Sequence, residues 1–400
     1  MKSINPSEAD DLIFANLPKV ESVDLPLINC AGRILRESIH ADRPFPPFNR
    51  AMMDGYAIRS KDLAAVNGFD IIAQLPAGAS PVEIGNTTGG CVEIMTGAVV
   101  PSDSDCVIPY ELTNKLENGQ VILNNPDQHT SGDFIHRVGS DQAEGTLLLE
   151  AGRVLGSREI AIAATCGHVH LKVSQMPAIA IVSTGDELVD VKQIPQAHQI
   201  RRSNDVAIQA ALGRSRLDIQ ESVHLPDDFE AVQSQLSRVM QQSRFVIVSG
   251  GISMGSKDYV PAVLDAMNLE KKFHGVAQKP GKPFGFWSSE SNAIFALPGN
   301  PLSALVCLHR YVLPALRLAL GQSQVKPSKV LLETEIPPID RLTRFLPVKL
   351  LRSGFAAPLP PQNSGDFVSI LSADGFIELQ PSNKKAEVKD GGSVNYYAWL

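Results

Sequence analysis

The clearest pattern in this chain is an alternation of apolar runs and amphipathic stretches between residues 177 and 322. Unbroken apolar runs such as Ala178–Val182 are typical of strands that are buried on both faces of a parallel sheet. The predicted elements are strands at Ala178–Val182, Leu217–Leu225, Phe245–Val248, 271–276, 284–287 and 293–296, and helices at Ser203–Leu212, Asp227–Met240 and Leu302–Leu320. This alternation predicts a doubly wound or similar three-layer α/β domain.

Local signals indicate where some helices begin or bend. Ser7-Glu-Ala-Asp10 resembles a capping box and predicts a short helix near Ser7. Ser203 or Asn204 has a side chain suited to the N-cap of the helix that follows. Pro314 lies inside the predicted Leu302–Leu320 helix. It predicts a kink, because proline has no N–H group and its ring clashes with the preceding turn.

The chain on both sides of the α/β domain contains shorter elements. Residues 49–140 are rich in Gly, Pro, Thr and Val, which predicts an inserted β-rich domain. Residues 141–176 contain a predicted helix at 158–164 and a strand at 168–173. A compact C-terminal β domain is predicted after residue 322, with strands at Val330–Ile336, Phe345–Leu350, Phe367–Leu371, Phe376–Leu379 and Val394–Trp399.

Composition excludes several classes of protein. Lys and Arg number 36 against 43 Asp and Glu, and no Lys/Arg run occurs, which argues against a nucleic-acid surface. The N-terminus has no apolar signal core, and His309, Arg310 and Arg317 interrupt the most apolar stretch, so a membrane span is not expected. The cysteines are scattered and odd in number, which predicts reduced thiols in a cytoplasmic protein: Cys30, Cys91, Cys106, Cys166 and Cys307.

Acidic residues follow three of the predicted strands. Ser183-Thr-Gly-Asp-Glu187 follows the first, Asp227 and Asp228 follow the second, and Asp258 follows the third. Ligands bind at the carboxyl ends of strands in open α/β sheets, and Mg²⁺ prefers carboxylates together with phosphates. The sequence therefore predicts a metal–phosphate site, although a single acid at such a position is usually a helix cap.

Two glycine-containing loops strengthen the prediction of an anion site. Ser249-Gly-Gly-Ile-Ser-Met-Gly255 follows a buried strand, and its N–H groups can surround an anion. In Leu297-Pro-Gly-Asn-Pro301, the asparagine and the last proline suit a helix start, whose free N–H groups favour an oxyanion. Lys279 and Lys282 can neutralise a phosphate. The alternatives are a tight turn, a structural cap and two solvated lysines.

Taken together and in this order, the motifs resemble those of the MoeA family of molybdopterin molybdenumtransferases, related to the C-terminal part of gephyrin. The resemblance spans nearly all of the chain. The motifs are Met53-Asp-Gly-Tyr-Ala57, Ile94-Met-Thr-Gly-Ala98, Gly139-Ser-Asp141, Ser183-Thr-Gly-Asp-Glu-Leu188, Ser203-Asn204, Ser249-Gly-Gly-Ile-Ser-Met-Gly255 with Asp258-Tyr259, Lys279-Pro-Gly-Lys-Pro283 and Leu297-Pro-Gly-Asn-Pro301.

The resemblance implies a homodimer whose chains have four domains. These are a discontinuous linking domain (1–48 and 141–176), an inserted β-rich domain (49–140), a MogA-like molybdopterin-binding α/β domain (177–322) and a C-terminal β domain (323–400). The implied reaction takes molybdate and adenylylated molybdopterin, uses Mg²⁺ and releases AMP. The implied site lies between the α/β domain of one subunit and the inserted domain of the other. A MogA-type adenylyltransferase and acceptor molybdoenzymes are implied as further partners.

The resemblance also implies roles for individual residues. The catalytic candidates are Asp54, Thr96, Asp141, Glu187, Asp228 and Asp258, and the metal candidates are Glu187, Asp228 and Asp258. The binding candidates are Ser183, Thr184, Gly185, Ser203, Asn204, Ser249, Gly250, Gly251, Ser253, Gly255, Lys279, Gly281, Lys282, Pro298, Gly299, Asn300 and Pro301.

Several positions depart from the family pattern. Ala51 replaces a serine, Met52 replaces a small residue, Arg201-Arg202 stands where many members have an acid, and Pro347 stands where many have a base. Three functions are therefore compared. The acids favour a molybdenum-inserting enzyme. The alternatives are a MogA-like molybdopterin adenylyltransferase that uses ATP, and a diverged molybdopterin carrier or scaffold without activity.

Overall fold

The computed structural model describes residues 3–253, 255, 258–337, 339–351, 354–362, 366–381 and 392–399. By its internal contacts the chain divides into two compact units. The larger unit comprises residues 1–36, 151–156 and 171–400, and the smaller unit comprises residues 37–150 and 157–170. The finer division into four domains stays a prediction.

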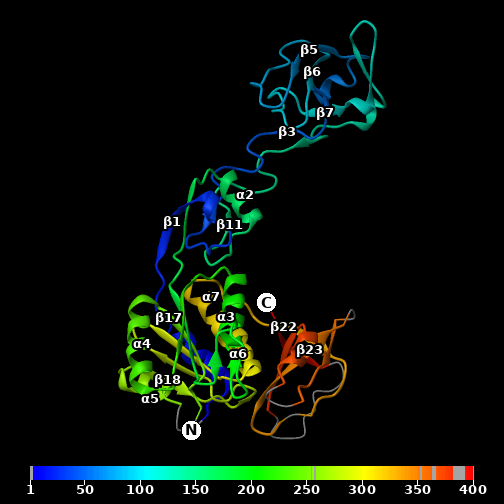
Figure 1. Cartoon of the computed structure of the whole chain (residues 1–400). Helices are drawn as coiled ribbons and strands as arrows, with labels where there is room; N and C mark the ends of the chain where they lie inside the picture. Colours follow the sequence, from blue (N-terminus) through cyan, green and yellow to red (C-terminus); the bar gives the residue numbers. More distant parts are fainter. Residues whose placement is uncertain are drawn as a thin grey trace. The chain divides into compact units, whose positions relative to one another are not determined.

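A six-stranded sheet forms the centre of the α/β domain (Figure 1). Its strands are, in spatial order, β16 (Ile219–Leu225), β13 (Ile179–Thr184), β17 (Phe245–Ser249), β21 (Ala293–Leu297), β20 (Gly285–Ser288) and β18 (Glu270–His274). The first four are parallel, and the last two are antiparallel to their neighbours. The predicted α/β architecture is confirmed, with a mixed sheet.

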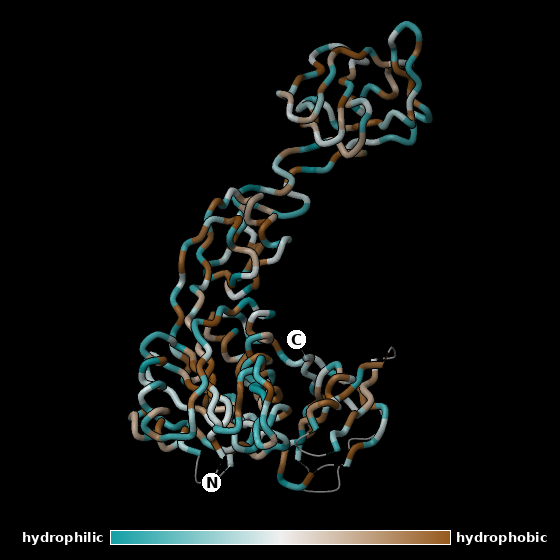
Figure 2. The backbone as a smooth tube through the Cα atoms, viewed as in Figure 1, coloured by the Kyte–Doolittle hydropathy of each residue, from teal (hydrophilic) through white to brown (hydrophobic). Residues whose placement is uncertain are grey.

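Helices cover both faces of this sheet, which gives three layers. Apolar side chains of β13 and β17 alternate between the two cores. Hydrophobic segments, in brown, gather in the interior of this domain (Figure 2). One face is covered by α1 (Pro6–Ala15), α3 (Ser203–Arg214), α6 (Pro301–Cys307) and α7 (Leu313–Ala319). The other face is covered by α4 (Phe229–Gln242) and α5 (Val260–Ala266).

Two predicted helix caps are wrong. In α1 the capping box is formed by Asn5 and Glu8 instead of Ser7 and Asp10, because Pro6 occupies the first helical position. The side chain of Asn5 accepts from the Glu8 N–H at 2.9 Å. Helix α3 begins at Ser203 without a side-chain cap, and Asn204 makes other contacts.

The helix at the end of the α/β domain is interrupted, but not by a kink at Pro314. A π-helical segment, η5 (Leu308–Val312), lies between α6 and α7, and Pro314 is near the start of α7. This wider segment lies where proline cannot donate a normal helical hydrogen bond. By length and composition alone, Pro301–Ala319 is apolar enough to cross a membrane, but 72% of its apolar window is buried inside the protein.

The C-terminal β domain contains a six-stranded sheet, in which five strands close on themselves and β19 pairs with one of them. Its strands are β19 (Gln278–Lys279), β23 (Thr343–Leu350), β24 (Phe355–Pro358), β22 (Ser328–Leu332), β26 (Ser393–Ala398) and β25 (Gly375–Leu379), and β25 also pairs with β23. The predicted strand at Phe367–Leu371 is wrong. That segment forms the 3₁₀-helix η6 (Val368–Ser372), because Asp366 accepts from the Ser369 N–H at 3.1 Å, and Leu371 is exposed.

The smaller unit confirms the predicted β-rich insertion. Its main sheet has the order β5 (Asp70–Leu75), β6 (Gly90–Ile94), β4 (Gly55–Ile58) and β7 (Cys106–Pro109). Short pairs join β3 (Arg50–Ala51) to β10 (Ile135–His136), β8 (Thr113–Lys115) to β9 (Val121–Leu123), and β2 (Ile39–His40) to β11 (Leu147–Leu149). Helix α2 spans Ser157–Thr165 in the same unit. In the larger unit, β1 (Ser22–Pro26) pairs with β12 (His170–Ser174). All five cysteines are buried free thiols, as predicted.

Candidate active site

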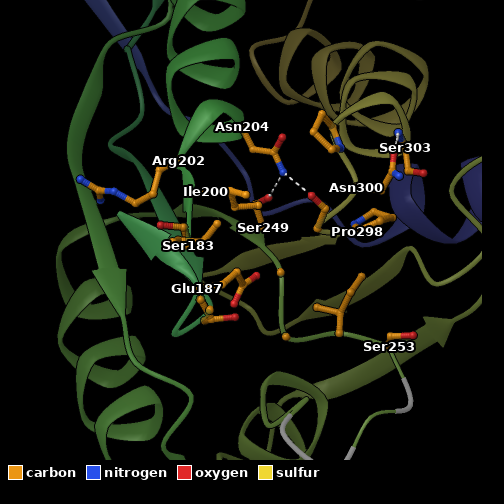
Figure 3. A pocket seen from close by; sticks show the side chains of 18 of the residues that line it. Ser183, Glu187, Ile200, Arg202, Asn204, Ser249, Ser253, Pro298, Asn300 and Ser303 are labelled. Carbon is orange, nitrogen blue, oxygen red and sulfur yellow. Dashed lines mark hydrogen bonds between the residues drawn. The ribbon is translucent and has the colours of Figure 1, made fainter. Parts of the chain in front are cut away.

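A cavity of about 660 Å³ lies at the carboxyl ends of the parallel strands β13, β17 and β21. The loops after these strands and the first turns of α3 and α6 line it (Figure 3). The predicted site residues found in its lining are Ser183, Thr184, Gly185, Glu187, Ser203, Asn204, Ser249, Gly250, Gly251, Ser253, Gly255, Asp258, Pro298, Gly299, Asn300 and Pro301. The structure therefore brings these residues together, and their individual roles stay predictions.

The glycines after β17 allow two strand ends to pack closely. Gly250 and Gly251 have φ angles of 94° and 64°, which favour glycine. A Cβ atom on Gly250 would lie 2.5 Å from the Thr184 carbonyl oxygen, and one on Gly251 would lie 2.4 Å from the Thr184 hydroxyl. Among the described residues that buried hydroxyl has no hydrogen-bond partner. It lines the cavity, so a bound ligand can satisfy it.

Asn204 connects three of the loops that surround the cavity. Its Nδ2 donates to the Ser249 hydroxyl at 2.9 Å and to the Gly299 carbonyl oxygen at 2.8 Å (Figure 3). Asn300 accepts from the Ser303 N–H at the start of α6. The N-termini of α3 and α6 therefore both lie at the cavity. Because a helix N-terminus carries partial positive charge and free N–H groups, this arrangement favours an anion.

A polar cluster in the wall of the cavity joins the predicted residue Ser183 to Asp205 and His224, which were not predicted from the sequence. The Ser183 hydroxyl donates to Asp205 at 2.9 Å and lies 3.3 Å from His224 Nδ1. Arg202 contacts Asp190 at 2.8 Å and Asp205 at 3.6 Å. Burial raises the pKa of the Asp205 carboxyl and lowers the pKa of the His224 imidazole. Burial disfavours the charged form of each residue. A charged ligand would therefore change the protonation of this cluster.

The acid that faces the cavity after β16 is Asp227, whereas Asp228 caps a helix. Asp227 and Asp186 exchange hydrogen bonds between carboxylate and backbone N–H at 3.1 and 3.3 Å, and Asp227 lines the cavity. The Asp228 carboxylate accepts from the Ala231 N–H at 2.8 Å as the N-cap of α4, and it is not among the lining residues. Asp227 thus faces the cavity while Asp228 serves as a helix cap, and the part that either acid plays in catalysis stays a prediction.

Replacing Asp228 by Ala is expected to reduce stability without removing activity. The loss of an N-cap hydrogen bond costs about 1 kcal/mol. Urea denaturation measures this change in the free energy of unfolding. The neighbouring variant Asp227→Ala is the matched control, and it should lower turnover while keeping the α4 cap. Loss of turnover in Asp228→Ala with a normal fold would restore Asp228 as the functional acid.

The carboxylates do not form a ready-made metal cage. Among the described residues, no group of three or more His, Cys, Asp or Glu side chains lies close enough to hold an ion. Asp258 accepts from the Gly255 N–H at 2.7 Å. Mg²⁺ usually takes one or two carboxylates and completes its coordination with water and substrate phosphates. The donor set therefore fits an ion that binds together with a phosphate ligand.

Three predicted binding residues do not line this cavity. Lys279 belongs to β19 and pairs with Arg344 of the C-terminal sheet. A Cβ atom on Gly281 would lie 2.6 Å from Gln278 Nε2 and 2.7 Å from the Cys307 sulfur, so this glycine serves close packing. Lys282 is also absent from the lining, and the loop contributes only Pro283. Lys279 thus lies in a strand that joins the other sheet, Lys282 follows that strand, and a binding role for either lysine stays a prediction.

The predicted residues of the smaller unit form two local clusters. Asp54 accepts from the Thr96 hydroxyl at 2.6 Å and from its N–H at 2.7 Å, which holds the pKa of Asp54 below its usual range. Asp141 lies 2.7 Å from His136 Nε2, and Arg50 donates to the other ring nitrogen of His136 at 3.2 Å. Asp54 and Thr96 are therefore joined, and the part these acids play in catalysis stays a prediction.

The positions that depart from the family pattern have different surroundings. Ala51 is buried, whereas Met52 is 53% exposed. Arg201 and Arg202 both line the cavity from the β14–β15 segment, where β14 (Leu188–Val189) and β15 (Ile200–Arg201) form a parallel pair. Pro347 pairs with Phe376 inside the C-terminal sheet. Two of the departures thus add positive charge beside the cavity.

Comparisons with known families cover most of the chain. Residues 4–167 match the MoeA N-terminal region (domain I and II), residues 180–318 match a probable molybdopterin binding domain, and residues 329–399 match the MoeA C-terminal region (domain IV). A molybdopterin molybdenumtransferase from Synechocystis sp. is 38% identical over 99% of this chain and 100% of its own length. One from Staphylococcus aureus is 29% identical over 93% of this chain and 90% of its own.

A solved structure has the same fold over its full length. The molybdopterin biosynthesis moeA protein from Pyrococcus horikoshii matches with a TM-score of 0.82 and 28% identity, covering 99% of both chains. The fold, the arrangement of motifs at the strand ends and the full-length relatives agree with one another. This chain therefore belongs to the MoeA family of molybdopterin molybdenumtransferases.

Proposed function

We propose that this chain inserts molybdenum from molybdate into adenylylated molybdopterin, with Mg²⁺-dependent release of AMP. The observation that carries the proposal is the full-length similarity to a molybdopterin molybdenumtransferase at 38% identity. The candidate active site supports it, because two helix N-termini and several acids lie around one cavity of suitable size.

The chemistry of the cavity suits the proposed substrates. Molybdate and the phosphate groups are oxyanions, which helix N-termini and loop N–H groups favour. Asp258, Glu187 and Asp227 are the acids available to hold Mg²⁺ together with those phosphates, and this ion would offset charge that develops as the phosphoanhydride breaks. The substrate itself supplies sulfur ligands for molybdenum. The protein therefore needs no cysteine in the cavity, and all five of its cysteines are buried elsewhere.

We further propose a cytoplasmic homodimer in which Asp54, Thr96 and Asp141 of the second subunit complete the site. The hydrogen bonds from Thr96 keep Asp54 ionised, which suits a residue that acts as an acceptor beside a cation. A MogA-type adenylyltransferase would supply the adenylylated substrate, and acceptor molybdoenzymes would take the product.

AMP release by the purified protein tests this proposal against its two alternatives. We expect release from adenylylated molybdopterin only when molybdate and Mg²⁺ are both present, and its loss when a chelator removes the Mg²⁺. Chromatography of the nucleotides measures the product. Consumption of ATP with unmodified molybdopterin would instead show an adenylyltransferase. Tight binding of molybdopterin without any nucleotide product would show a carrier.

A further inference from the structure

A second cavity, of about 400 Å³, lies at the C-terminal ends of α3 and α7. Helix α3 begins at the active-site cavity with Ser203 and ends at Arg214, and its 12 residues span about 18 Å. The second cavity is lined by four arginines from three separate segments, here named the arginine pocket: Arg33, Arg214, Arg216 and Arg317. No Asp or Glu is among its described lining residues.

In the part of the chain that the structure describes, no ion pair joins any of the four arginines to a carboxylate. Arg317 donates to the Ser215 hydroxyl at 3.4 Å. By contrast, Arg310 in the preceding π-helical segment donates to Asp10 at 2.8 Å and to Glu378 at 3.2 Å. The same run of helix therefore carries one arginine with two counter-ions and one with none.

Burial makes the absence of a counter-ion costly for Arg317. Burial alone lowers the pKa of Arg317. Burial also acts to lower the pKa of Arg310, but Asp10 and Glu378 more than offset it and raise that pKa. A half-buried cation without a partner is unfavourable. An anion in the pocket would offset this cost.

One side of the pocket depends on a glycine. The side chain of Arg216 lies against the backbone of Gly32, where a Cβ atom would be 2.1 Å from its Nη1 and 2.5 Å from its Cδ. Gly32 has a φ of 80°, and Arg216 has a φ of 56°, a conformation that non-glycine residues rarely adopt. Arg216 is thereby held beside the turn that carries Arg33.

Helix dipoles explain only part of the cluster. Arg214 and Arg317 lie in the last turns of α3 and α7, where a positive charge is favourable. Arg33 and Arg216 lie outside helices, so a helix dipole does not explain their position. The concave shape and the lack of acids in the lining are also left unexplained by the dipoles.

We propose that the arginine pocket binds a tetrahedral oxyanion with two or more negative charges, such as phosphate or molybdate. Guanidinium groups are planar, stay charged and donate paired hydrogen bonds that match the oxygens of such anions. Two of the four side chains are half-buried and two are exposed, so an anion can enter from solvent. The site is separate from the candidate active site and does not depend on the proposed reaction.

Crystals of the full chain soaked in molybdate test the proposal directly. We expect an anomalous molybdenum peak between the four arginines in the wild type, and no peak there in Arg317→Gln. Calorimetric titration with phosphate and with molybdate should show this site losing affinity by at least about tenfold in Arg317→Gln. If Arg317→Gln does not fold, Arg214→Gln replaces it in the same measurements, because Arg214 is exposed. Arg238→Gln, which removes an equal charge from the Arg238–Glu221 surface pair, is the matched control and should bind normally.

The two anions distinguish the source of the ligand. A site that takes molybdate but not phosphate would hold the molybdenum source, whereas one that takes both would be a general phosphate site. Equal affinities in wild type and Arg317→Gln, with no peak in the pocket, would overturn the proposal. Sedimentation in which Arg317→Gln turns a dimer into monomers would also overturn it, because the arginines would then pair with a second subunit.

Discussion

Replacing Asp258 by Asn is expected to lower turnover by about 100-fold or more, equal to about 3 kcal/mol of activation free energy. Asp258 lines the cavity at the end of β17, next to the glycine loop, and Gly255 N–H holds its carboxylate at 2.7 Å. Asparagine keeps an acceptor for this N–H but removes the negative charge. The loss should therefore appear in molybdate-dependent AMP release, with little change in the free energy of unfolding.

Asp265 provides the control for this variant. It lies near the end of α5, the helix that follows Asp258, where its carboxylate contacts Lys271 and accepts from Trp287 Nε1 at 3.0 Å. Asp265→Asn also removes one negative charge, but it lies outside the cavity lining and should keep near-normal turnover. Wild-type turnover in Asp258→Asn would mean that this carboxylate only stabilises the loop, through its hydrogen bond with the Gly255 N–H.

Replacing Arg310 by Ala should have the largest effect on stability, a loss of about 3–5 kcal/mol. Arg310 is buried and joins α1 to the C-terminal sheet through Asp10 and Glu378. Glu378 also accepts from the Tyr397 hydroxyl at 2.6 Å. Removing the guanidinium would leave two carboxylates without their cation in a buried place. Urea denaturation would measure the lower free energy of unfolding.

Arg317 is the natural comparison for Arg310, since it lies in the next helical segment and pairs with no carboxylate among the residues that the structure describes. Arg317→Ala should change stability little, because it removes a desolvated charge that nothing compensates. If the two variants lose the same stability, packing of the side-chain stems decides the result instead of the buried ion pairs.

Buried strands and the loops that follow them could be predicted well from the sequence. The unbroken apolar runs at β13 and β17 are typical of central parallel strands. Because neighbouring parallel strands end at the same edge, the serines, glycines and Asp258 after these strands were expected to meet, and they do. Local pattern and topology agree here.

The details that could not be predicted from the sequence depend on which of two neighbouring residues faces the cavity or the backbone. Asp227 and Asp228 are equivalent by composition, and only the exact start of α4 makes Asp228 a cap. The Ser183–His224 contact depends on the register between β13 and β16, which no single segment encodes. The position of Lys279 could not be predicted for a similar reason, because a two-residue strand joins it to a sheet formed by chain far downstream.

The most direct test of molybdenum insertion is the stoichiometry of the reaction. Purified protein is given adenylylated molybdopterin, Mg²⁺ and molybdate, and the AMP released and the molybdenum bound to molybdopterin are measured together. Equal amounts of AMP and molybdopterin-bound molybdenum, both lost in Asp258→Asn, are the predicted result. AMP release at the same rate without molybdate, or molybdenum binding without AMP release, would contradict it.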